Sequence, residues 1–210
     1  MKNKLLKILS AVLIFALCFA LAGCGNKNSI ESETTSTTEK TNNIGTVKAV
    51  IDVAGYGEIY LELYGDIAPI TVNNFVNLVN SNFYDGLTFH RVVKDFIIQG
   101  GDPEADGTGG SEEKIKGEFY QNNVKNDISH TRGTISMARR PDDPNSASSQ
   151  FFIVQKDATY LDGGYAAFGR VTEGMDIVDK IIEETPIADT ATGFVEKTKQ
   201  PCITSIKIIE

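Results

Sequence analysis

Short runs that alternate apolar and polar residues dominate the chain after residue 46. The first two runs, at 47–53 and 58–64, flank Gly55 and Gly57 and therefore predict a β-hairpin. Six further candidate strands follow at 87–93, 96–99, 133–138, 150–155, 167–171 and 202–209. Eight short strands separated by glycine-rich turns predict a mainly β fold, an antiparallel barrel or sandwich.

Two segments instead repeat their apolar residues at helical spacing. Pro69 suits the first turn of a helix, where its missing N–H costs no hydrogen bond. The apolar face of this helix would consist of Val72, Phe75, Val76 and Val79. A second helix is predicted from about Glu173 to Ile182, and its apolar face would consist of Met175, Val178 and Ile181 or Ile182. We interpret both faces as packing on the core and not as binding a partner.

The N-terminal end has the pattern of an export signal. Three lysines precede an apolar run of fifteen residues, Ile8 to Ala22, in which only Ser10 is polar. The run is short for a membrane span, which needs about 20 apolar residues, but is typical of a signal peptide. The following Leu-Ala-Gly-Cys, which ends at Cys24, resembles the lipobox of bacterial lipoproteins and implies a lipid on Cys24. An uncleaved helical anchor is the alternative, and both interpretations place the rest of the chain outside the cytoplasm.

A polar segment separates this signal from the strand-rich part of the chain. Ser, Thr, Asn and Glu dominate residues 25–45, and Ile30 and Ile44 are the only large apolar side chains there. Such a segment cannot bury enough apolar surface to offset its chain entropy. We therefore expect a lipoprotein signal peptide at 1–23, a lipidated cysteine with a flexible polar tether at 24–45, and one domain at 46–210.

The net charge narrows the range of partners. It is −8 for the whole chain and would be −11 without residues 1–23, which carry three lysines and no acidic residue. Without a basic cluster, the sequence argues against a nucleic-acid partner. An acidic domain would stay away from an anionic membrane, so acyl chains on Cys24 would supply the attachment. No pattern resembles a dimer seam, and we expect a monomer.

One cysteine remains after the signal and the lipidation site are set aside. This residue, Cys202, lies in an apolar run near the C-terminus, and we expect it to be a small buried hydrophobic residue. No intrachain disulfide would be available. The two histidines, His90 and His130, have no cysteine spacing beside them that would indicate a metal site. We expect neither a metal nor a cofactor.

The stretch FHRVVKDFIIQGGD, residues 89–102, places two polar side chains among strand-like apolar residues. Side chains alternate between the faces of a strand, so Arg91 shares a face with Phe89, and Gln99 shares one with Ile97. If the two strands pair, a cation and an amide project together over an apolar floor. Such a pocket suits an apolar substrate with one amide to be held and polarised. His90 would point to the opposite face, as a hydrogen-bonded structural histidine.

This stretch closely resembles the signature of the cyclophilin-type peptidyl-prolyl cis–trans isomerases. The likeness continues through GTGG at 107–110, GTISMAR at 133–139, SSQFFIV at 148–154, YLDGGYAAFGRV at 160–171 and GMDIVDKI at 174–181. It implies a closed eight-stranded antiparallel β-barrel capped by two α-helices. Residues 107–110 lack the strand–loop–helix context and the lysine of a phosphate-binding loop, so we expect a surface turn there.

The resemblance also implies the roles of individual residues. Arg91 would be catalytic, and the proline pocket would consist of Phe96, Ile97, Phe152 and Leu161. Contacts to the substrate backbone would come from Gln99, Gln150 and the backbone around Ala138. Tyr160 and Tyr165 stand where the best-known eukaryotic relatives have Trp and His, and Ile97 replaces a Met. Both tyrosines would either line the rim of the pocket or cover the barrel, and cyclosporin binding would be possible but weakened.

Two functions from different classes remain open at this point. The first is an extracytoplasmic, membrane-anchored isomerase that assists the folding of exported or surface proteins by rotating their X–Pro bonds. The alternative is a chaperone or adaptor that binds proline segments with little turnover. Arg91 favours the enzyme, because binding alone has little use for a donor that points at the amide nitrogen. Both functions require proline-containing polypeptides as partners.

Overall fold

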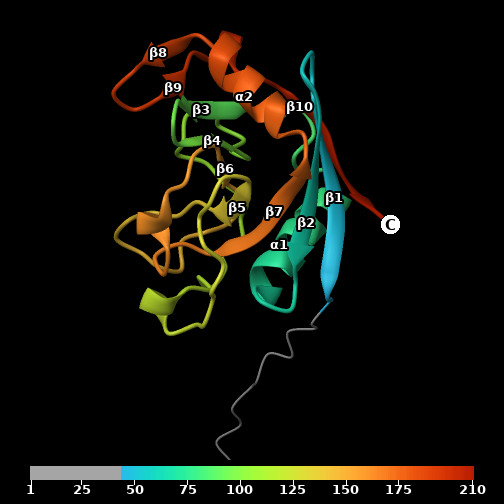
Figure 1. The fold of residues 1–210 in the computed structure, drawn as a ribbon, viewed down its shortest axis with the longest axis vertical. Coiled ribbons are helices and arrows are strands. Elements are labelled where there is room, and N and C mark those ends of the chain that lie inside the picture. The colour runs from blue at the N-terminus through green and yellow to red at the C-terminus, as the bar shows by residue number, and fades with distance from the viewer. Residues whose placement is uncertain (1–43) are drawn as a thin grey trace, which may run out of the picture. The chain divides into compact units, whose positions relative to one another are not determined.

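The computed structural model describes residues 44–210. In this part of the chain, an antiparallel sheet and two helices enclose a hydrophobic core (Figure 1). The signal peptide, the lipidation site at Cys24 and the tether as far as residue 43 lie outside the described residues, so these remain predictions from sequence. None of the helices within 44–210 is long and apolar enough to cross a membrane.

Ten strands of the described region form one antiparallel sheet. They are β1 (Thr46–Val53), β2 (Gly57–Tyr64), β3 (Phe89–Val93), β4 (Ile97–Gly100), β5 (Thr134–Met137), β6 (Phe151–Val154), β7 (Ala167–Glu173), β8 (Ile187–Asp189), β9 (Phe194–Val195) and β10 (Ile203–Ile209). Their order in the sheet is β10-β1-β2-β7-β5-β6-β4-β3-β9-β8. Each of the eight strands expected from the sequence is present, and the hairpin of β1 and β2 is confirmed.

The sheet differs from the closed eight-stranded barrel in two respects. Its hydrogen-bonded order is open, with β10 and β8 at its ends. An isolated bridge between Thr88 and Cys202, with three backbone hydrogen bonds between residues 86–89 and 201–203, brings the start of β10 beside the start of β3 without a continuous ladder. The second difference is the hairpin of β8 and β9, which pairs with β3 through Phe194 and Arg91. The sequence did not indicate this hairpin because its strands have only three and two residues.

Two α-helices and three short 3₁₀ helices complete the fold. The α-helices are α1 (Pro69–Asn80) and α2 (Met175–Glu184), and they lie toward opposite ends of β2 in Figure 1. The 3₁₀ helices span Tyr120–Asn122, Thr159–Leu161 and Lys197–Lys199. Both α-helices bury the faces that their periodicity predicts, which include Val72, Phe75 and Val79 in α1 and Val178, Ile181 and Ile182 in α2. Their interpretation as core-packing elements is confirmed.

A glutamate from a distant loop completes the N-terminal end of α1. The residue before this helix is Ala68, whose side chain accepts no hydrogen bond. The buried carboxylate of Glu118 instead accepts hydrogen bonds from the backbone N–H groups of Ile70, at 3.1 Å, and Thr71, at 2.8 Å. The Thr71 hydroxyl donates a third, at 2.6 Å. First-turn N–H groups have no partner within a helix, and negative charge is favourable there, so Glu118 stabilises α1 in both ways.

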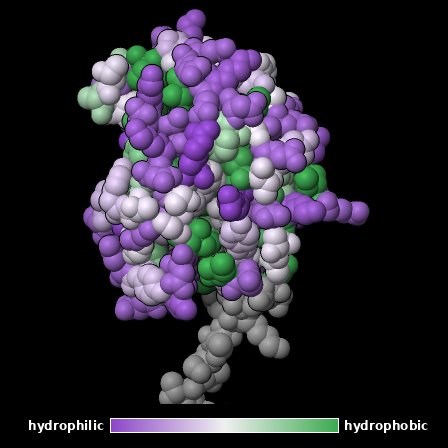
Figure 2. All heavy atoms as spheres, viewed as in Figure 1, coloured by the Kyte–Doolittle hydropathy of each residue, from purple (hydrophilic) through white to green (hydrophobic). Residues whose placement is uncertain are grey.

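Hydrophobic side chains divide into a large core and a smaller cluster. In the large core, the Phe75 ring lies 5.1–5.6 Å from those of Tyr84, Phe151 and Phe168. The smaller cluster consists of Ile97, Phe152, Val154 and Ala158, with Phe96, Ala138, Leu161 and Tyr165 packed against it. On the face shown in Figure 2, hydrophilic residues predominate and hydrophobic residues form small separate patches. The smaller cluster is the floor of the site described below.

Cys202 departs from its expected burial. It is half-buried, whereas its neighbours Pro201 and Ile203 are buried. Alternation along the strand therefore turns Cys202 away from the interior, and its thiol lies 3.7 Å from the carbonyl oxygen of Ile203. The prediction of a buried hydrophobic residue was wrong because an apolar run near the end of a chain need not be buried on both faces.

Candidate active site

Strand pairing brings Arg91 and Gln99 together. In the antiparallel register of β3 and β4, the two residues are direct partners. The Arg91 guanidinium donates a hydrogen bond from Nη1 to Oε1 of Gln99, at 3.2 Å. A cation and an amide therefore project side by side from adjacent strands, as the alternation in residues 89–102 predicts.

Side-chain amides continue from this pair toward the glycine-rich loop. Nε2 of Gln99 donates to Oε1 of Gln150 on the neighbouring segment, at 2.9 Å. Nε2 of Gln150 donates in turn to the carbonyl oxygens of Gly109, at 2.7 Å, and Gly107, at 3.2 Å. The hydrogen bonds orient both amides, so Gln99 faces Arg91 with its oxygen and Gln150 with its nitrogen. One amide hydrogen of Gln99 remains available to a substrate.

The other side of Arg91 is held by the hairpin of β8 and β9. Its Nε donates to the backbone carbonyl oxygen of Thr192, at 2.7 Å. The guanidinium carbon also lies 5.9 Å from the centre of the Phe96 ring. Among the described residues, three of the five guanidinium N–H groups have no hydrogen-bond partner. Burial lowers the pKa of Arg91, but the pKa of an arginine lies so far above neutral pH that the guanidinium stays protonated.

A cavity of about 230 Å³ with an apolar floor lies beside these free donors. It is lined by Arg91, Phe96, Ile97, Gln99, Ala138, Arg139, Phe152, Leu161 and Tyr165. Ile97 and Phe152 form its buried floor, each with 3% of its surface exposed. The structure thus brings eight of the ten residues that the resemblance implicates to one cavity, and places Gln150 and Tyr160 next to it.

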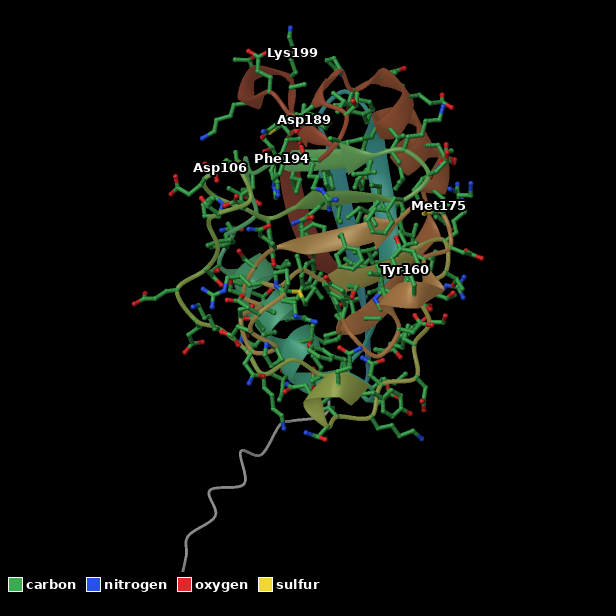
Figure 3. All side chains as sticks on the ribbon, turned by 90° about the vertical axis from the view of Figure 1, so that its left-hand side faces the viewer. Asp106, Tyr160, Met175, Asp189, Phe194 and Lys199 are labelled. Carbon is green, nitrogen blue, oxygen red and sulfur yellow. The ribbon has the colours of Figure 1, made fainter. Side chains whose placement is uncertain are left out.

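The two tyrosines occupy different positions. Tyr165 lines the cavity, with its ring edge-on to Phe152 at 5.8 Å. Tyr160 is 75% exposed and stacks on Phe96 at 5.9 Å, so it lies at the rim, on the side of the molecule that faces the viewer in Figure 3. Both tyrosines therefore lie at the pocket, which is one of the two alternatives that the sequence left open.

A second layer of polar residues supports the wall formed by Phe152. The His130 ring is buried and stacks on Phe152, with 6.0 Å between ring centres. Its Nδ1 lies 2.8 Å from a carboxylate oxygen of Asp162, and its Nε2 lies 3.0 Å from the Ser136 hydroxyl. Burial lowers the pKa of His130, although the hydrogen bond with Asp162 acts in the opposite direction. A neutral His130 is thus fixed behind the cavity wall.

His90 is buried on the opposite face from Arg91, but it is not hydrogen-bonded as expected. Neither ring nitrogen has a partner in the described part of the chain. The ring stacks on Phe194 of β9 at 6.0 Å, and burial lowers its pKa. The expectation of a satisfied histidine failed because an aromatic ring from β9, which was not predicted, covers this position.

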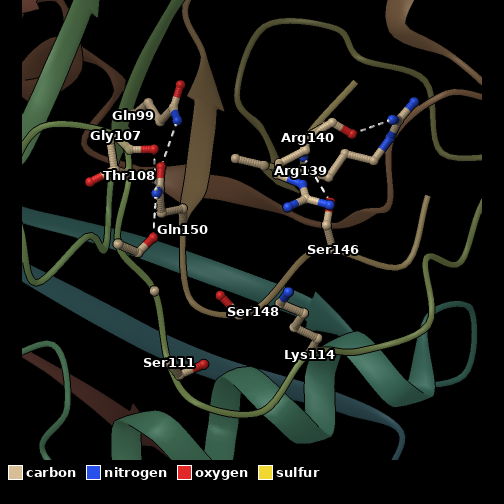
Figure 4. Close-up of a pocket in the computed structure, with 13 residues that line it drawn as sticks. Gln99, Gly107, Thr108, Ser111, Lys114, Arg139, Arg140, Ser146, Ser148 and Gln150 are labelled. Atoms are coloured by element: carbon tan, nitrogen blue, oxygen red, sulfur yellow. Dashed lines mark hydrogen bonds between the residues drawn. The ribbon is translucent and has the colours of Figure 1, made fainter. Parts of the chain in front are cut away.

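A larger cavity of about 610 Å³ adjoins this smaller one (Figure 4). The two share Gln99, Ala138 and Arg139 in their linings, so they lie next to each other. Residues 107–110 line the larger cavity, which means that this segment is more than the surface turn that the sequence suggested. Gln150 lies in the same lining.

Two contributors to the site were not assigned a role from the sequence. Arg139 lines both cavities, and its guanidinium lies over the rings of Tyr165, at 4.8 Å, and Phe119, at 5.1 Å. Arg139 belongs to the GTISMAR motif, which was the available signal. Thr192 contributes its backbone carbonyl, and no sequence pattern could have indicated that. Within residues 44–210, no cluster of three or more His, Cys, Asp or Glu side chains could hold a metal ion.

Comparison with known proteins decides the family. The family described as cyclophilin type peptidyl-prolyl cis-trans isomerase/CLD matches residues 48–208. The chain belongs to this family. A peptidyl-prolyl cis-trans isomerase of Acinetobacter baylyi is 46% identical over 130 residues, which are 60% of this chain and 66% of that protein. One from Schizosaccharomyces pombe is 43% identical over 126 residues, 60% of this chain and 79% of that protein.

The solved structure of another cyclophilin has the same fold as this chain. It is the cyclophilin type peptidyl-prolyl cis-trans isomerase of Cryptosporidium parvum, determined in the presence of the dipeptide Ala-Pro. The two share 30% sequence identity with a TM-score of 0.68, and the match covers 78% of this chain and 99% of that chain. The cyclophilin domain described here is therefore a mainly β, antiparallel fold with two helices, within a family of enzymes.

Proposed function

We propose that this cyclophilin accelerates rotation about X–Pro peptide bonds in exported or surface proteins and so assists their folding. Arg91 would be the catalytic residue. The observation that carries the proposal is the position of its guanidinium, which is fixed at the edge of a cavity with an apolar floor, with three N–H groups free. The cavity offers a proline ring an apolar surface, and the free donors face the place where its amide would lie.

The size of the barrier sets what the site must achieve. Rotation about an X–Pro bond has a barrier of about 20 kcal/mol and takes tens to hundreds of seconds unaided. A turnover of ~10³ per second requires a barrier of about 13 kcal/mol. The site must therefore stabilise the transition state by about 6–7 kcal/mol relative to the bound planar forms, without breaking a covalent bond.

Arg91 can supply a large part of this stabilisation. When the amide twists, its resonance is lost and the proline nitrogen regains a lone pair. A guanidinium that donates to this nitrogen binds the twisted amide more strongly than either planar form, which is the condition for catalysis. Fixed donors in a site of low polarity are worth several kcal/mol in comparable cases, and Thr192 and Gln99 already hold this one in place.

The other residues would hold the substrate around this point. Phe96, Ile97, Phe152 and Leu161 would bind the proline ring while the preceding carbonyl rotates. Gln99 would use its free amide hydrogen on the substrate backbone, and the backbone at Ala138 would contribute there as well. Tyr160 at the rim, in place of a Trp, would weaken cyclosporin binding without abolishing turnover.

The location of the activity rests on the sequence of the first 45 residues. Their basic start, apolar run and Cys24 support a lipoprotein whose domain faces the outside of the membrane, attached through acyl chains. Mass spectrometry of the mature N-terminus tests this location. A diacylated Cys24 is expected, and an unmodified Met1 or Cys24 would refute the anchor.

Exchange NMR on a short Ala-Pro peptide tests the activity. With the protein at a small fraction of the peptide concentration, we expect broadening of the peptide resonances from accelerated cis–trans exchange, and loss of this broadening in Arg91→Ala. Saturable binding without exchange would instead support the adaptor function. The Ala-Pro dipeptide used with the Cryptosporidium parvum relative makes this peptide the natural first substrate.

A further inference from the structure

The larger cavity of about 610 Å³ has a charge that contrasts with the chain around it. Its lining includes Lys114, Arg139 and Arg140 but no Asp or Glu. The chain as a whole has a net charge of −8. A positive lining in an acidic protein is a selective feature, because it attracts anionic groups to one place while the rest of the surface repels them.

Of the three cations that line the larger cavity, Lys114 is the one most available to a bound anion. Its ammonium has no ion-pair or hydrogen-bond partner among the described residues. The backbone around it is fixed, because the next residue, Ile115, donates to the carbonyl oxygen of Ala147 at 2.8 Å in an isolated β-bridge. Figure 4 shows the Lys114 side chain extending from its loop toward Ser146 and Ser148. A ligand in this cavity therefore meets the ammonium and the Ser148 hydroxyl, whereas the Ser146 hydroxyl already donates to the carbonyl oxygen of Asp143, at 2.7 Å.

The two arginines contribute less free charge. Arg139 donates to the carbonyl oxygens of Gly164, Arg140 and Pro141, and so has a structural role. Arg140 forms ion pairs with Asp142, at 3.5 Å, and Asp143, at 3.3 Å. These pairs are exposed to water and therefore weak, so Arg140 keeps part of its attraction for a ligand anion.

The floor of the larger cavity is rigid. Gln150 binds the carbonyl oxygens of Gly107 and Gly109, and Asn74 of α1 binds that of Ser148, at 2.6 Å. A Cβ atom on Gly110 would collide with the Ser148 hydroxyl, so the loop packs closely against that segment. A ligand would enter a preformed groove and would not need to order it.

We propose that this groove binds an acidic side chain of the substrate, close to the proline. The inference rests on the proposed function, since the two cavities share Gln99, Ala138 and Arg139 and one peptide would occupy both. An extended chain advances about 3.3–3.6 Å per residue, so the acidic residue would lie two or three positions from the proline. Lys114 is then a residue that determines specificity for Asp and Glu.

Matched peptides test this preference with the full chain in a nonionic detergent. The peptides carry Glu, Gln or Lys two residues before or two residues after one Ala-Pro bond, and kcat/KM and Kd are measured for each. We expect Glu to exceed Gln by about two- to fivefold at one of the two positions, with Lys below Gln. The preference should shrink in 0.5 M salt, because the groove is open to solvent.

Two variants assign the preference to Lys114. In Lys114→Gln, the Glu-to-Gln ratio should fall toward one, whereas Lys207→Gln, on β10 and outside both cavities, should keep it. Equal turnover of the Glu and Gln peptides at both positions would overturn the inference, and so would an unchanged ratio in Lys114→Gln. Absence of turnover with every peptide would refute the proposed function instead, so the two failures are distinct.

Discussion

The Nε atom of Arg91 donates a 2.7 Å hydrogen bond to the backbone carbonyl oxygen of Thr192, a residue 101 positions later in the chain. Gln99 holds the opposite side of the same guanidinium through Nη1. The cation is thus fixed between a neighbouring strand and a hairpin close to the end of the domain. Its free donors have a defined direction before any substrate arrives, as transition-state stabilisation by a fixed donor requires.

Replacement of Arg91 should abolish most turnover and leave the fold intact. Loss of one preorganised donor typically costs 10²–10³ in rate, so we expect Arg91→Ala to reduce kcat/KM for an Ala-Pro peptide by about that factor. Arg91→Lys should recover little, because an ammonium lacks the planar fork of donors. Exchange NMR measures the rates, and circular dichroism checks the fold. The control is Arg170→Ala, on the exposed side of β7. Full activity in Arg91→Ala would contradict the assignment.

Asp189 should act on the rate through the turn that presents Thr192. Its carboxylate accepts hydrogen bonds from the Ala191 N–H, at 2.9 Å, and the Thr192 hydroxyl, at 2.7 Å, and these bonds lower its pKa. In Asp189→Asn one charged acceptor is lost, and the Thr192 carbonyl should hold Arg91 less firmly. We expect kcat to fall by roughly three- to tenfold with little change in KM, since a hydrogen bond to a charged acceptor is stronger than one to a neutral acceptor and only part of it is lost.

A matched control separates this effect from a general loss of charge. Asp66→Asn removes an exposed carboxylate far from the hairpin in sequence and outside both cavities. It should leave kcat unchanged. An equal fall of kcat in both variants, or a change in KM alone for Asp189→Asn, would show that the turn does not position Arg91.

Glu118→Gln should destabilise the domain. An amide has one acceptor oxygen where the carboxylate has two, so the three hydrogen bonds at the start of α1 cannot all persist, and the favourable charge is lost. We expect the free energy of unfolding to fall by about 2–3 kcal/mol, measured by urea denaturation. Glu112→Gln, at an exposed position, is the control and should stay within about 0.5 kcal/mol of the original protein.

The stability of the domain should decrease as the pH falls below about 6.5. Burial lowers the pKa of both His90 and His130, so the unfolded chain binds protons that the folded protein excludes. Their contribution is therefore complete above the unfolded pKa of about 6.5 and is lost below it, by up to about 1.4 kcal/mol per pH unit for each histidine. Urea denaturation between pH 7.5 and 5 measures this slope.

A substitution at His90 assigns part of that slope. His90→Leu removes a titrating ring whose two nitrogens have no hydrogen-bond partner. We expect the pH dependence to become shallower and the stability at pH 5 to rise relative to the original protein. Burial has the largest effect on the pKa of His90 and lowers it, as Arg91 does, whereas Asp102 and Asp106 raise it. The expected change requires that the effect of burial exceed that of the two carboxylates. An unchanged slope in His90→Leu would show that His90 does not titrate in this range.

The sequence predicts the elements whose signals are local. Alternation gave the eight principal strands and the faces on which Arg91 and Gln99 lie, because a two-residue period determines which side chains share a face. Helical spacing gave α1 and α2 within two residues of their ends. Alternation also predicted an apolar floor beneath Arg91 and Gln99, the family resemblance named its residues, and the structure places Ile97 and Phe152 there.

Contacts between distant parts of the chain were beyond this kind of reasoning. The hairpin of β8 and β9 has strands too short for a periodic signal, and with it the Thr192 carbonyl and the ring that covers His90 were missed. Glu118 resembles any surface glutamate in the sequence, although it is buried at the start of a helix. The open order of the sheet was missed for a related reason, because strand patterns specify faces and not which edges meet.

The dependence of α1 on Glu118 also bears on the order in which the chain can assemble. A polypeptide that emerges from its N-terminus presents β1, β2 and the helical segment well before residue 118, since Thr71 and Glu118 are separated by 47 positions. Until the later segment arrives, the opening turn of α1 has only water as an acceptor for its amide groups. Early fragments of this protein should therefore hold that turn frayed, and it should become rigid only when the middle of the chain docks.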